Sequence, residues 1–391
     1  MTGISGKAAI VGIGATEFSK NSGRSELRLA LEAVTTAIKD AGLSPKEIDG
    51  LVTFNFDSSP EGDISRSIGA DNVTYLAEAP YGGGAACAVV QHAALAVIAG
   101  VARAVVCYRA FNERSGFRFG APMDRPASLD PKPLDVHIGR YAPFGLMTPA
   151  GWVAMAARRY MHEFGATSED FGRVAVIARD HAATNPKAWF YEKPITLEQH
   201  QVSRLIVDPL RLLDCCQESD GGVAFVITTA ERARDLKQKP VLIKAAAQGM
   251  GPDQEMMTSY YRESISGLPE MANVGRQLWE QSGLTPQDIQ TLVLYDHFTP
   301  FVLPQLEELG FCKRGEARHL IASGALGRGG RWPMNTHGGQ LGEAYIHGLN
   351  GVAEAVRQVR GQAANQVTGL QHVLVTAGTG VPTSGLILGI D

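Results

Sequence analysis

The sequence predicts an α/β fold in which helices cover both faces of a sheet, and three features support this. Strand-like and helical segments alternate from the start: the apolar run Lys7–Gly12 is followed by Ser25–Ala41, whose apolar residues recur at helical spacing. The predicted strands are apolar almost throughout, which is typical of a mostly parallel sheet buried on both faces. The second half of the chain repeats the strand–helix order of the first, which indicates a two-fold internal duplication.

The first half contains one helix of unusual composition. The glycine run Gly82–Gly84 opens the helix Ala85–Ala99, which is apolar nearly all round and should therefore lie at the centre of the molecule. The glycine that follows the earlier helix, Gly42, is expected to be its C-cap. The predicted strands of this half are Lys7–Gly12, Ile48–Phe54, Asn72–Leu76 and Ala102–Tyr108.

The alternation stops at Asn112. The stretch 112–205 is richer in Pro, Arg, Asp and aromatic residues and holds the amphipathic segments Gly151–Phe164 and Ser168–Thr184, so we expect an insertion that lies over the sheet domain. The strand pattern resumes at Gly221–Thr229. We therefore predict a first half formed by 1–111 plus 206–236, an inserted loop domain 112–205, and a second half 237–391.

The second half is predicted to repeat the strand–helix order and to end in a glycine-rich block, Asn335–Gly351, that leads into a helix. Glycines before a helix let backbone N–H groups approach a substrate closely, and a helix N-terminus favours developing negative charge. The predicted strands are Val241–Ala246, Thr291–Tyr295, His372–Thr376 and Ser384–Ile390. The predicted helices are Met271–Ser282, Pro304–Leu309 and Val352–Val359.

Bulk composition excludes several classes of protein. The net charge of −4, from 36 basic and 40 acidic residues, argues against nucleic-acid binding. No apolar run reaches the length of a membrane span, and no His, Cys or Asp residues have the spacing of metal ligands. Five cysteines in no ligand spacing favour a reduced cytoplasm. Gly12 and Gly14 could suggest a dinucleotide-binding loop, but Glu17 stands where its third glycine would be.

Several motifs resemble the thiolase superfamily, most closely the sterol-carrier-protein-type thiolases and the bacterial lipid-transfer proteins. The motifs are Arg158–Met161, Arg179–Pro186, the run Ser203–Gly222, and the glycine-rich block, which resembles the last conserved block of thiolases. The resemblance covers nearly the whole chain. It implies the thiolase fold, with duplicated five-stranded mixed sheets in αβαβα layers and an inserted loop domain, and it implies a homodimer.

The chain departs from the thiolase pattern at the active positions. Gly84 stands where the nucleophilic cysteine belongs, and Thr376 where the second cysteine belongs. Tyr345 replaces the histidine of the last block, and Tyr295 replaces the histidine of a His-Asp-Cys-Phe block. Without a nucleophile no acyl-enzyme forms, so Claisen chemistry should be lost, whereas two phenols at one thioester site still suit proton transfer.

This pattern resembles the actinobacterial lipid-transfer-protein aldolases of steroid side-chain degradation. The resemblance implies cleavage of 17-hydroxy-3-oxo-4-pregnene-20-carboxyl-CoA to a 17-ketosteroid (androstenedione) and propionyl-CoA. It also implies a complex with the OB-fold, zinc-ribbon-containing domain of a partner acyl-CoA hydratase, in a heterotetramer. No cofactor is expected, since CoA is part of the substrate.

Tyr295 and Tyr345 are therefore the predicted acid and base, in either order. A free phenol has a pKa near 10, so the base should need help from the helix N-termini at Gly84 and Gly351 or from a nearby histidine. The remaining candidate residues of the site are Asp296, His297 and His347 beside the tyrosines, and Gly83, Gly84, Asn335, Gly338 and Gly339 around the CoA thioester.

For each of these residues a structural role remains open. Asp296 either orients a catalytic group or caps a turn, the histidines suit structural roles, and Asn335 suits hydrogen bonding within its loop. The loop Gly327–Arg331 either receives a CoA phosphate or is simply solvated.

Two other functions also remain open. One is a thiolase or acyltransferase that uses Cys87, although that residue suits a small buried core position better. The other is a carrier of acyl-CoA or lipid without catalysis.

Overall fold

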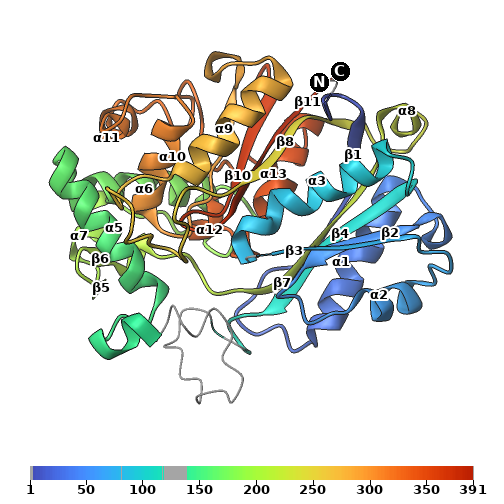
Figure 1. The fold of residues 1–391 in the computed structure, drawn as a ribbon, viewed down its shortest axis with the longest axis horizontal. Helices are drawn as coiled ribbons and strands as arrows, with labels where there is room; N and C mark the ends of the chain where they lie inside the picture. The colour runs from blue at the N-terminus through green and yellow to red at the C-terminus, as the bar shows by residue number, and fades with distance from the viewer. Residues whose placement is uncertain (1–2, 81, 117, 119–138, 391) are drawn as a thin grey trace.

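A computed structural model describes residues 3–80, 82–116, 118 and 139–390, and shows a wide sheet with helices on both sides (Figure 1). The main strands are β1 (Ala8–Ala15), β2 (Gly50–Phe54), β3 (Tyr75–Ala79), β4 (Ala104–Asn112), β7 (Asp220–Thr229), β8 (Val241–Gly249), β9 (Thr291–Val293), β10 (His372–Ala377) and β11 (Thr383–Gly389). A separate hairpin consists of β5 (Leu205–Val207) and β6 (Leu210–Arg211).

The helices of the described residues include seven that the sequence predicted, with shifts of a few residues at some ends, and five short ones that it did not predict. They are α1 (Glu26–Ala41), α2 (Glu61–Ile68), α3 (Ala85–Ile98), α5 (Pro149–Phe164), α6 (Ser168–Ala183), α7 (Leu197–Val202), α8 (Ala230–Ala233), α9 (Pro269–Ser282), α10 (Val302–Glu308), α11 (Ala317–Ala322), α12 (Gly339–Gly342) and α13 (Leu349–Arg360). Gly42 caps α1 with a left-handed backbone (φ 75°), as expected.

The main sheet is continuous, with strand order β3-β2-β4-β7-β1-β8-β11-β10-β9. The two halves of the chain meet where β1 pairs with β8, through Ala9↔Leu242 and Ile10↔Val241. The first half contributes five strands and the second half four. The fifth position of the second half holds only an isolated bridge, Leu292↔Met334, because Asn335 then turns away with a left-handed backbone (φ 51°).

The prediction of a mostly parallel sheet was wrong. In the main sheet of the described residues, the pairs β2–β3, β2–β4 and β9–β10 are parallel and the other five are antiparallel. The short turn between β10 and β11 allows only antiparallel pairing. Helices cover both faces of the sheet, so its antiparallel strands are as apolar as parallel ones, and the apolar runs could not distinguish the two.

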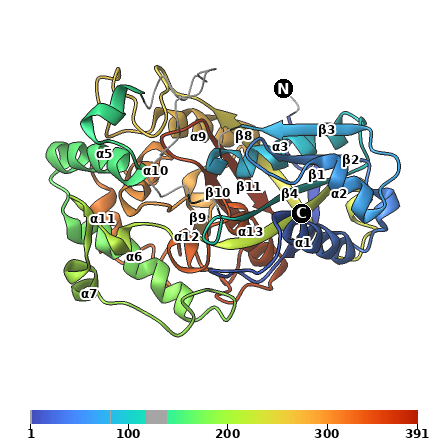
Figure 2. The same ribbon diagram turned by 90° about the horizontal axis from the view of Figure 1, so that it is seen from below.

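Three hydrophobic cores hold together five layers: outer helices, one half of the sheet, central helices, the other half of the sheet and outer helices. One core packs α1 and α2 on the outer face of the first half-sheet, and a second packs α5, α6, α9 and α10 on the outer face of the second. The third core lies between the half-sheets and is built around α3 and α13. Strand β1 shows the alternation, since Ala8 and Ile10 face the middle core and Ala9 and Val11 the outer one. Seen from below, α5, α6, α7 and α11 lie at one end of the molecule and α1, α2 and β3 lie at the other (Figure 2).

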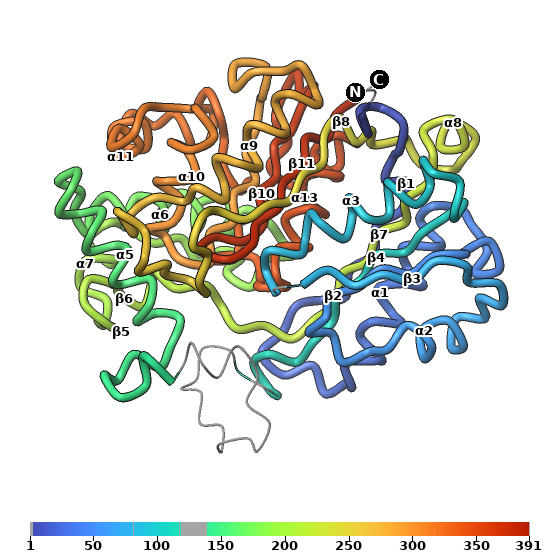
Figure 3. Tube along the Cα trace, in the orientation of Figure 1, coloured from blue at the N-terminus to red at the C-terminus, as the bar shows by residue number. Residues whose placement is uncertain are grey.

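The predicted central helix is confirmed, because α3 contributes ten buried residues to the middle core. Helices α5 and α6 lie beside α10 and α11, so this part of the predicted insertion covers the second half (Figure 1). Part of that insertion, residues 117 and 119–138, lies outside the described residues, and its boundaries remain predictions. The two ends of the described chain lie on the same side of the molecule in the view of Figure 3 but are separated in depth, as the view from below shows (Figure 2).

Candidate active site

The two tyrosines that sequence reasoning selected lie together. Tyr295 follows the end of β9, and Tyr345 lies between α12 and α13. Their hydroxyl oxygens are 3.0 Å apart, and the two residues are only 3% and 8% exposed. Burial raises the pKa of both phenols well above its ordinary value. At neutral pH the pair therefore carries both protons and acts first as a pair of donors.

Tyr295 is held by its backbone. Its N–H donates to Thr376 Oγ1 at 2.9 Å, and its carbonyl accepts from Gln305 Nε2 at 2.8 Å. The Thr376 hydroxyl in turn donates to Gln305 Oε1 at 2.6 Å. The residue at the second thiolase cysteine position therefore fixes the strand end that carries Tyr295.

Glycines make room for the Tyr295 side chain. A Cβ at Gly83 would overlap the Tyr295 hydroxyl, and a Cβ at Gly348 would lie 3.1 Å from its ring. The close approach of the ring to both backbones requires residues without side chains. Gly83, which was predicted to lie against the thioester, thus lies against the phenol.

Asp296 and Gly339 also pack against each other. The Asp296 Oδ1 atom accepts from Gln340 N at 2.8 Å, and Oδ2 lies where a Cβ of Gly339 would be. Burial raises the Asp296 pKa to about 6. Asn335 fixes the same strand end, since its amide oxygen accepts from Leu294 N at 2.8 Å and its amide nitrogen donates to Leu294 O at 3.0 Å.

Both candidate histidines are buried near the tyrosines. The His297 ring lies 4.9 Å from the Tyr295 ring, and the His347 ring 5.2 Å from the Tyr345 ring. Burial lowers the pKa of His297 to about 3 and that of His347 well below its ordinary value, with Arg109 adding to the second shift. Both imidazoles are thus neutral, and neither helps a phenol to ionise through a positive charge.

Sequence analysis missed the group that holds His347. Arg109 is fully buried in β4, and its Nε donates to His347 Nδ1 at 3.3 Å while its Nη1 pairs with Asp57 at 3.1 Å. The His347 ring also stacks on Phe111 at 4.8 Å. A single arginine within an otherwise apolar strand was the available signal, because a buried charge needs a partner.

The helix N-termini differ from expectation. Helix α13 begins at Leu349 with Gly348 as its cap (φ 90°), so Gly351 lies inside the first turn instead of before it. At Gly84, the cap of α3, a Cβ would overlap the Pro382 carbonyl. Gly338 has a left-handed backbone (φ 111°) and packs against Ala182.

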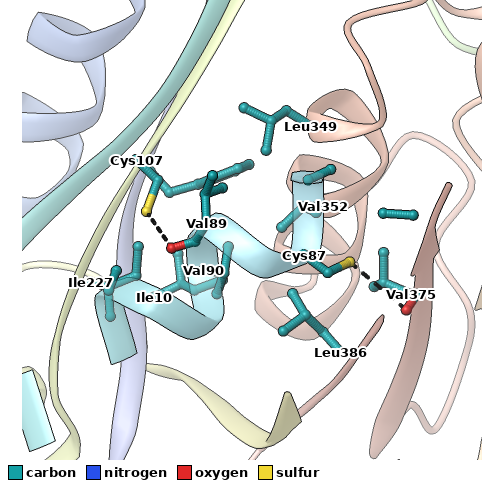
Figure 4. Packing of buried hydrophobic residues seen from close by; sticks show 14 of the residues in the cluster. Ile10, Cys87, Val89, Val90, Cys107, Ile227, Leu349, Val352, Val375 and Leu386 are labelled. Atoms are coloured by element: carbon teal, nitrogen blue, oxygen red, sulfur yellow. Dashed lines mark hydrogen bonds between the residues drawn. The ribbon is translucent and has the colours of Figure 1, made fainter. Parts of the chain in front are cut away.

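Cys87 is a core residue. Its thiol is fully buried, contacts the Val375 carbonyl at 4.0 Å and lies among Val90, Val352 and Leu386 (Figure 4). Burial raises its pKa far above the ordinary value, so the nucleophilic thiolate is disfavoured. Burial also raises the pKa of the Cys216 thiol, which interacts electrostatically with both phenols.

The loop with Arg328 lines a surface pocket of about 520 Å³ together with His181 and Asn365. Arg328 already binds Asp180 at 3.3 Å and Thr184 Oγ1 at 2.9 Å. Within the described ranges, no group of three or more His, Cys, Asp or Glu side chains could hold a metal ion. In the same ranges, none of the helices has the length and hydropathy that a membrane span requires.

Comparisons with known proteins agree with this geometry. Residues 253–389 match the family model "Thiolase C-terminal domain-like". The chain is 66% identical to the 17-hydroxy-3-oxo-4-pregnene-20-carboxyl-CoA lyase of Mycobacterium tuberculosis, covering 99% of this chain and 100% of the relative. It is 65% identical to the steroid side-chain-cleaving aldolase of Thermomonospora curvata over the full length of both.

The chain belongs to the thiolase superfamily, among the steroid side-chain-cleaving aldolases. A solved structure of an "Ltp2-ChsH2(DUF35) aldolase" superposes on this aldolase with a TM-score of 0.95 at 65% identity, covering 99% of each chain. The predicted family and thiolase fold are thereby confirmed. The roles of the single site residues remain predictions.

Proposed function

We propose that this aldolase cleaves 17-hydroxy-3-oxo-4-pregnene-20-carboxyl-CoA by a retro-aldol reaction to androstenedione and propionyl-CoA. The observation that carries the proposal is the contact of 3.0 Å between the Tyr295 and Tyr345 hydroxyls in a buried site. Burial keeps the thiols of Cys87 and Cys216 protonated, which disfavours either as the nucleophile of a thiolase. The names of relatives at 65–66% identity supply the steroid substrate.

The phenol pair can move the two protons that the reaction requires. One phenol receives the proton of the substrate hydroxyl while its own proton passes to the second phenol across the 3.0 Å contact. The Cα–Cβ bond breaks to form the ketone, and its electrons become the thioester enolate. The other phenol protonates the enolate carbon, which gives the acyl-CoA product. Neutral His297 and His347 suit hydrogen bonding to the thioester or to a phenol, and no cofactor takes part.

Glycines at the site suit a thioester. Gly83 brings its backbone close to Tyr295, and Gly339 brings its backbone close to Asp296. We assign these two glycines, together with Gly84 and Gly338, to binding of the CoA thioester. Asn335 holds the strand end before Tyr295 in place through two hydrogen bonds to Leu294.

We propose that this aldolase is a homodimer and that it binds the OB-fold, zinc-ribbon-containing domain of an acyl-CoA hydratase. We place the complex in the reduced cytoplasm. The superposed aldolase is named for two components, Ltp2 and ChsH2, which supports a partner. Leu76 is 60% exposed on β3, the edge strand of the sheet, which supports an interface along that edge. All five cysteines are free thiols.

The test is incubation with the tertiary β-hydroxyacyl-CoA steroid, with and without the partner domain, and detection of propionyl-CoA by mass spectrometry. Tyr345→Phe and Tyr295→Phe should each lower kcat by about two or more powers of ten, since each removes a proton-transferring group. Tyr191→Phe is the control, because Tyr191 is 39% exposed whereas the pair is buried. Full activity of both site variants would refute the assignment. Tight binding without turnover would instead indicate a carrier.

A further inference from the structure

The hydrogen bond from Arg109 sets the tautomer of His347. The Arg109 Nε–H donates to His347 Nδ1 at 3.3 Å, so Nδ1 presents its lone pair to the arginine. A neutral imidazole then holds its proton on the other nitrogen, Nε2. Protonation of both nitrogens would turn an N–H group and a second positive charge toward the guanidinium. His347 is therefore held in the Nε2–H form, as a hydrogen-bond donor.

Arg109 is itself fixed in place. Its Nη1 donates to Phe56 O and to Asp57 Oδ2, both at 3.1 Å, and the Arg109 and Asp57 side chains are 1% and 0% exposed. The Arg109 Cζ atom lies 4.4 Å from the centre of the Phe111 ring, and the His347 ring stacks on the same ring at 4.8 Å. Separation of a buried charge pair is costly, so the guanidinium keeps its place during the reaction.

The opposite edge of the imidazole faces the site. A Cβ at Gly82 would lie 3.5 Å from His347 Cε1 and 3.6 Å from His347 Nε2. Gly82 opens the glycine run before α3, and a Cβ at the next residue, Gly83, would overlap the Tyr295 hydroxyl. The His347 ring also meets the Tyr345 ring edge-on, at 87° and 5.2 Å. Nε2 thus lies beside the glycine run that we assign to the thioester.

The second histidine of the site is held differently. His297 Nδ1 contacts the Thr379 hydroxyl at 3.3 Å. A hydroxyl can donate or accept, so this contact fits both tautomers of His297. The His297 ring otherwise packs against the rings of Phe298 and Phe301. A donor of fixed direction is therefore expected from His347.

We propose that Arg109 is a positioning residue that holds His347 as a hydrogen-bond donor to the thioester oxygen. The proposal rests on the retro-aldol function. Cleavage of the Cα–Cβ bond moves negative charge onto that oxygen as the enolate forms, and a donor already in place stabilises the charge. His347 keeps its proton throughout, because Nε2 is already protonated and Nδ1 already accepts from Arg109. Proton transfer stays with the two phenols.

Two substitutions at His347 separate a donor from a structural partner of Arg109. An Asn side chain can accept from Arg109 in the place of Nδ1, and Asn tolerates the left-handed backbone of this residue (φ 48°). A Gln side chain can instead donate from the place of Nε2. The assay is deuterium uptake at the α-carbon of propionyl-CoA in D2O, by the full chain with its partner domain, which reports enolate formation without the steroid.

The two variants should rank in the order that the donor role requires. We expect uptake to fall by about a hundredfold in His347→Asn, the scale for loss of one oxyanion donor, and by no more than about tenfold in His347→Gln. An equal or larger loss in His347→Gln would overturn the donor role. No uptake by the wild type would also refute it, whatever the result with the steroid.

Arg109→Lys tests the positioning role. Lys keeps the charge beside Asp57 but replaces the fixed fork by a point charge, so uptake should fall at least about tenfold with KM within about threefold. In the His347→Gln background the same change should alter uptake by less than about twofold, because an amide has no tautomer to set. Arg103→Lys is the matched control, since Arg103 pairs with Asp49 at 3.2 Å but is 72% exposed. Equal effects of Arg109→Lys in both backgrounds would overturn the positioning role.

The tautomer can also be measured in the unaltered protein. With 15N-labelled histidine, His347 Nδ1 should resonate as an unprotonated nitrogen and Nε2 as a protonated one, and the two signals are assigned by their loss in His347→Gln. A proton on Nδ1 would overturn the proposal even if the retro-aldol reaction is observed. If the expected tautomer and uptake are found but the steroid releases no ketone, the proposed substrate fails and the role of Arg109 stands.

Discussion

The two central helices, α3 and α13, occupy corresponding places in the two halves but bury different residues. The buried face of α3 is apolar throughout, from Ala85 to Val97. The buried face of α13 includes Asn350, Glu354 and Gln358. The Thr336 hydroxyl donates to Glu354 at 2.7 Å, which ties α13 to the glycine-rich block.

The difference indicates that the second half of the chain, and not the N-terminus of α3, carries the reacting side chains. In the first half, the N-terminus of α3 is used by the chain itself, because Ala88 N donates to Ser384 Oγ at 3.1 Å and that hydroxyl donates to Gly84 O at 2.6 Å. No thiolate stands there to benefit from the helix dipole. In the second half, a buried polar network supports the loop that presents Tyr345 to Tyr295.

Substitution at Gly83 should have the largest effect on this contrast. In Gly83→Ala, the new methyl group overlaps the Tyr295 hydroxyl, while Gly348 leaves the ring no room to retreat. We expect kcat to fall by about two powers of ten, because displacement of a reacting group by about 1 Å has that scale. Gly62→Ala in α2 is the control, since its methyl group meets nothing within 4 Å. Wild-type kcat in Gly83→Ala would show that the exact place of the Tyr295 hydroxyl is unimportant.

The polar network around α13 should appear as pH-dependent stability. Burial raises the pKa of Glu343 to about 7, against an ordinary 4.5. The folded state therefore binds this proton more tightly than the unfolded state, and the contribution is present below about pH 4.5 and lost as the pH rises to about 7. At about 1.4 kcal/mol per pKa unit, the loss is about 3 kcal/mol.

Glu343→Gln should remove this loss. Denaturant unfolding at pH 5 and pH 8 should show a smaller fall in the free energy of unfolding for the variant than for the wild type. Asn350 Oδ1, which has no hydrogen-bond donor among the described residues, could accept from the new amide. Glu280→Gln, at a side chain that is 62% exposed, should leave the pH dependence unchanged. An equal fall in the wild type and Glu343→Gln would show that Glu343 is ionised in the folded state at little cost.

Sequence reasoning succeeded where a local pattern fixes the outcome. Apolar spacing located α3, and the glycine-rich block located Tyr345. The prediction of parallel strands failed, because pairing between residues far apart in the sequence decides the direction of neighbouring strands. Sequence reasoning also missed Arg109, whose partner His347 lies 238 residues away. No local pattern records that such residues share one site.

Replacement of Cys87 should have the smallest effect on activity, and it tests the first half of the comparison. Cys87→Ala removes one buried sulfur that contacts Val375 O, so we expect kcat within about twofold and a loss of about 1 kcal/mol in the free energy of unfolding. Iodoacetamide should not label Cys87 in the folded protein, because burial keeps the thiol protonated and inaccessible. Labelling of Cys87 with loss of activity, or a thioester trapped on Cys87, would show that Cys87 in the first half is the reacting residue. The phenol pair would then be a packing contact, and the contrast between α3 and α13 would no longer mark the active side of the fold.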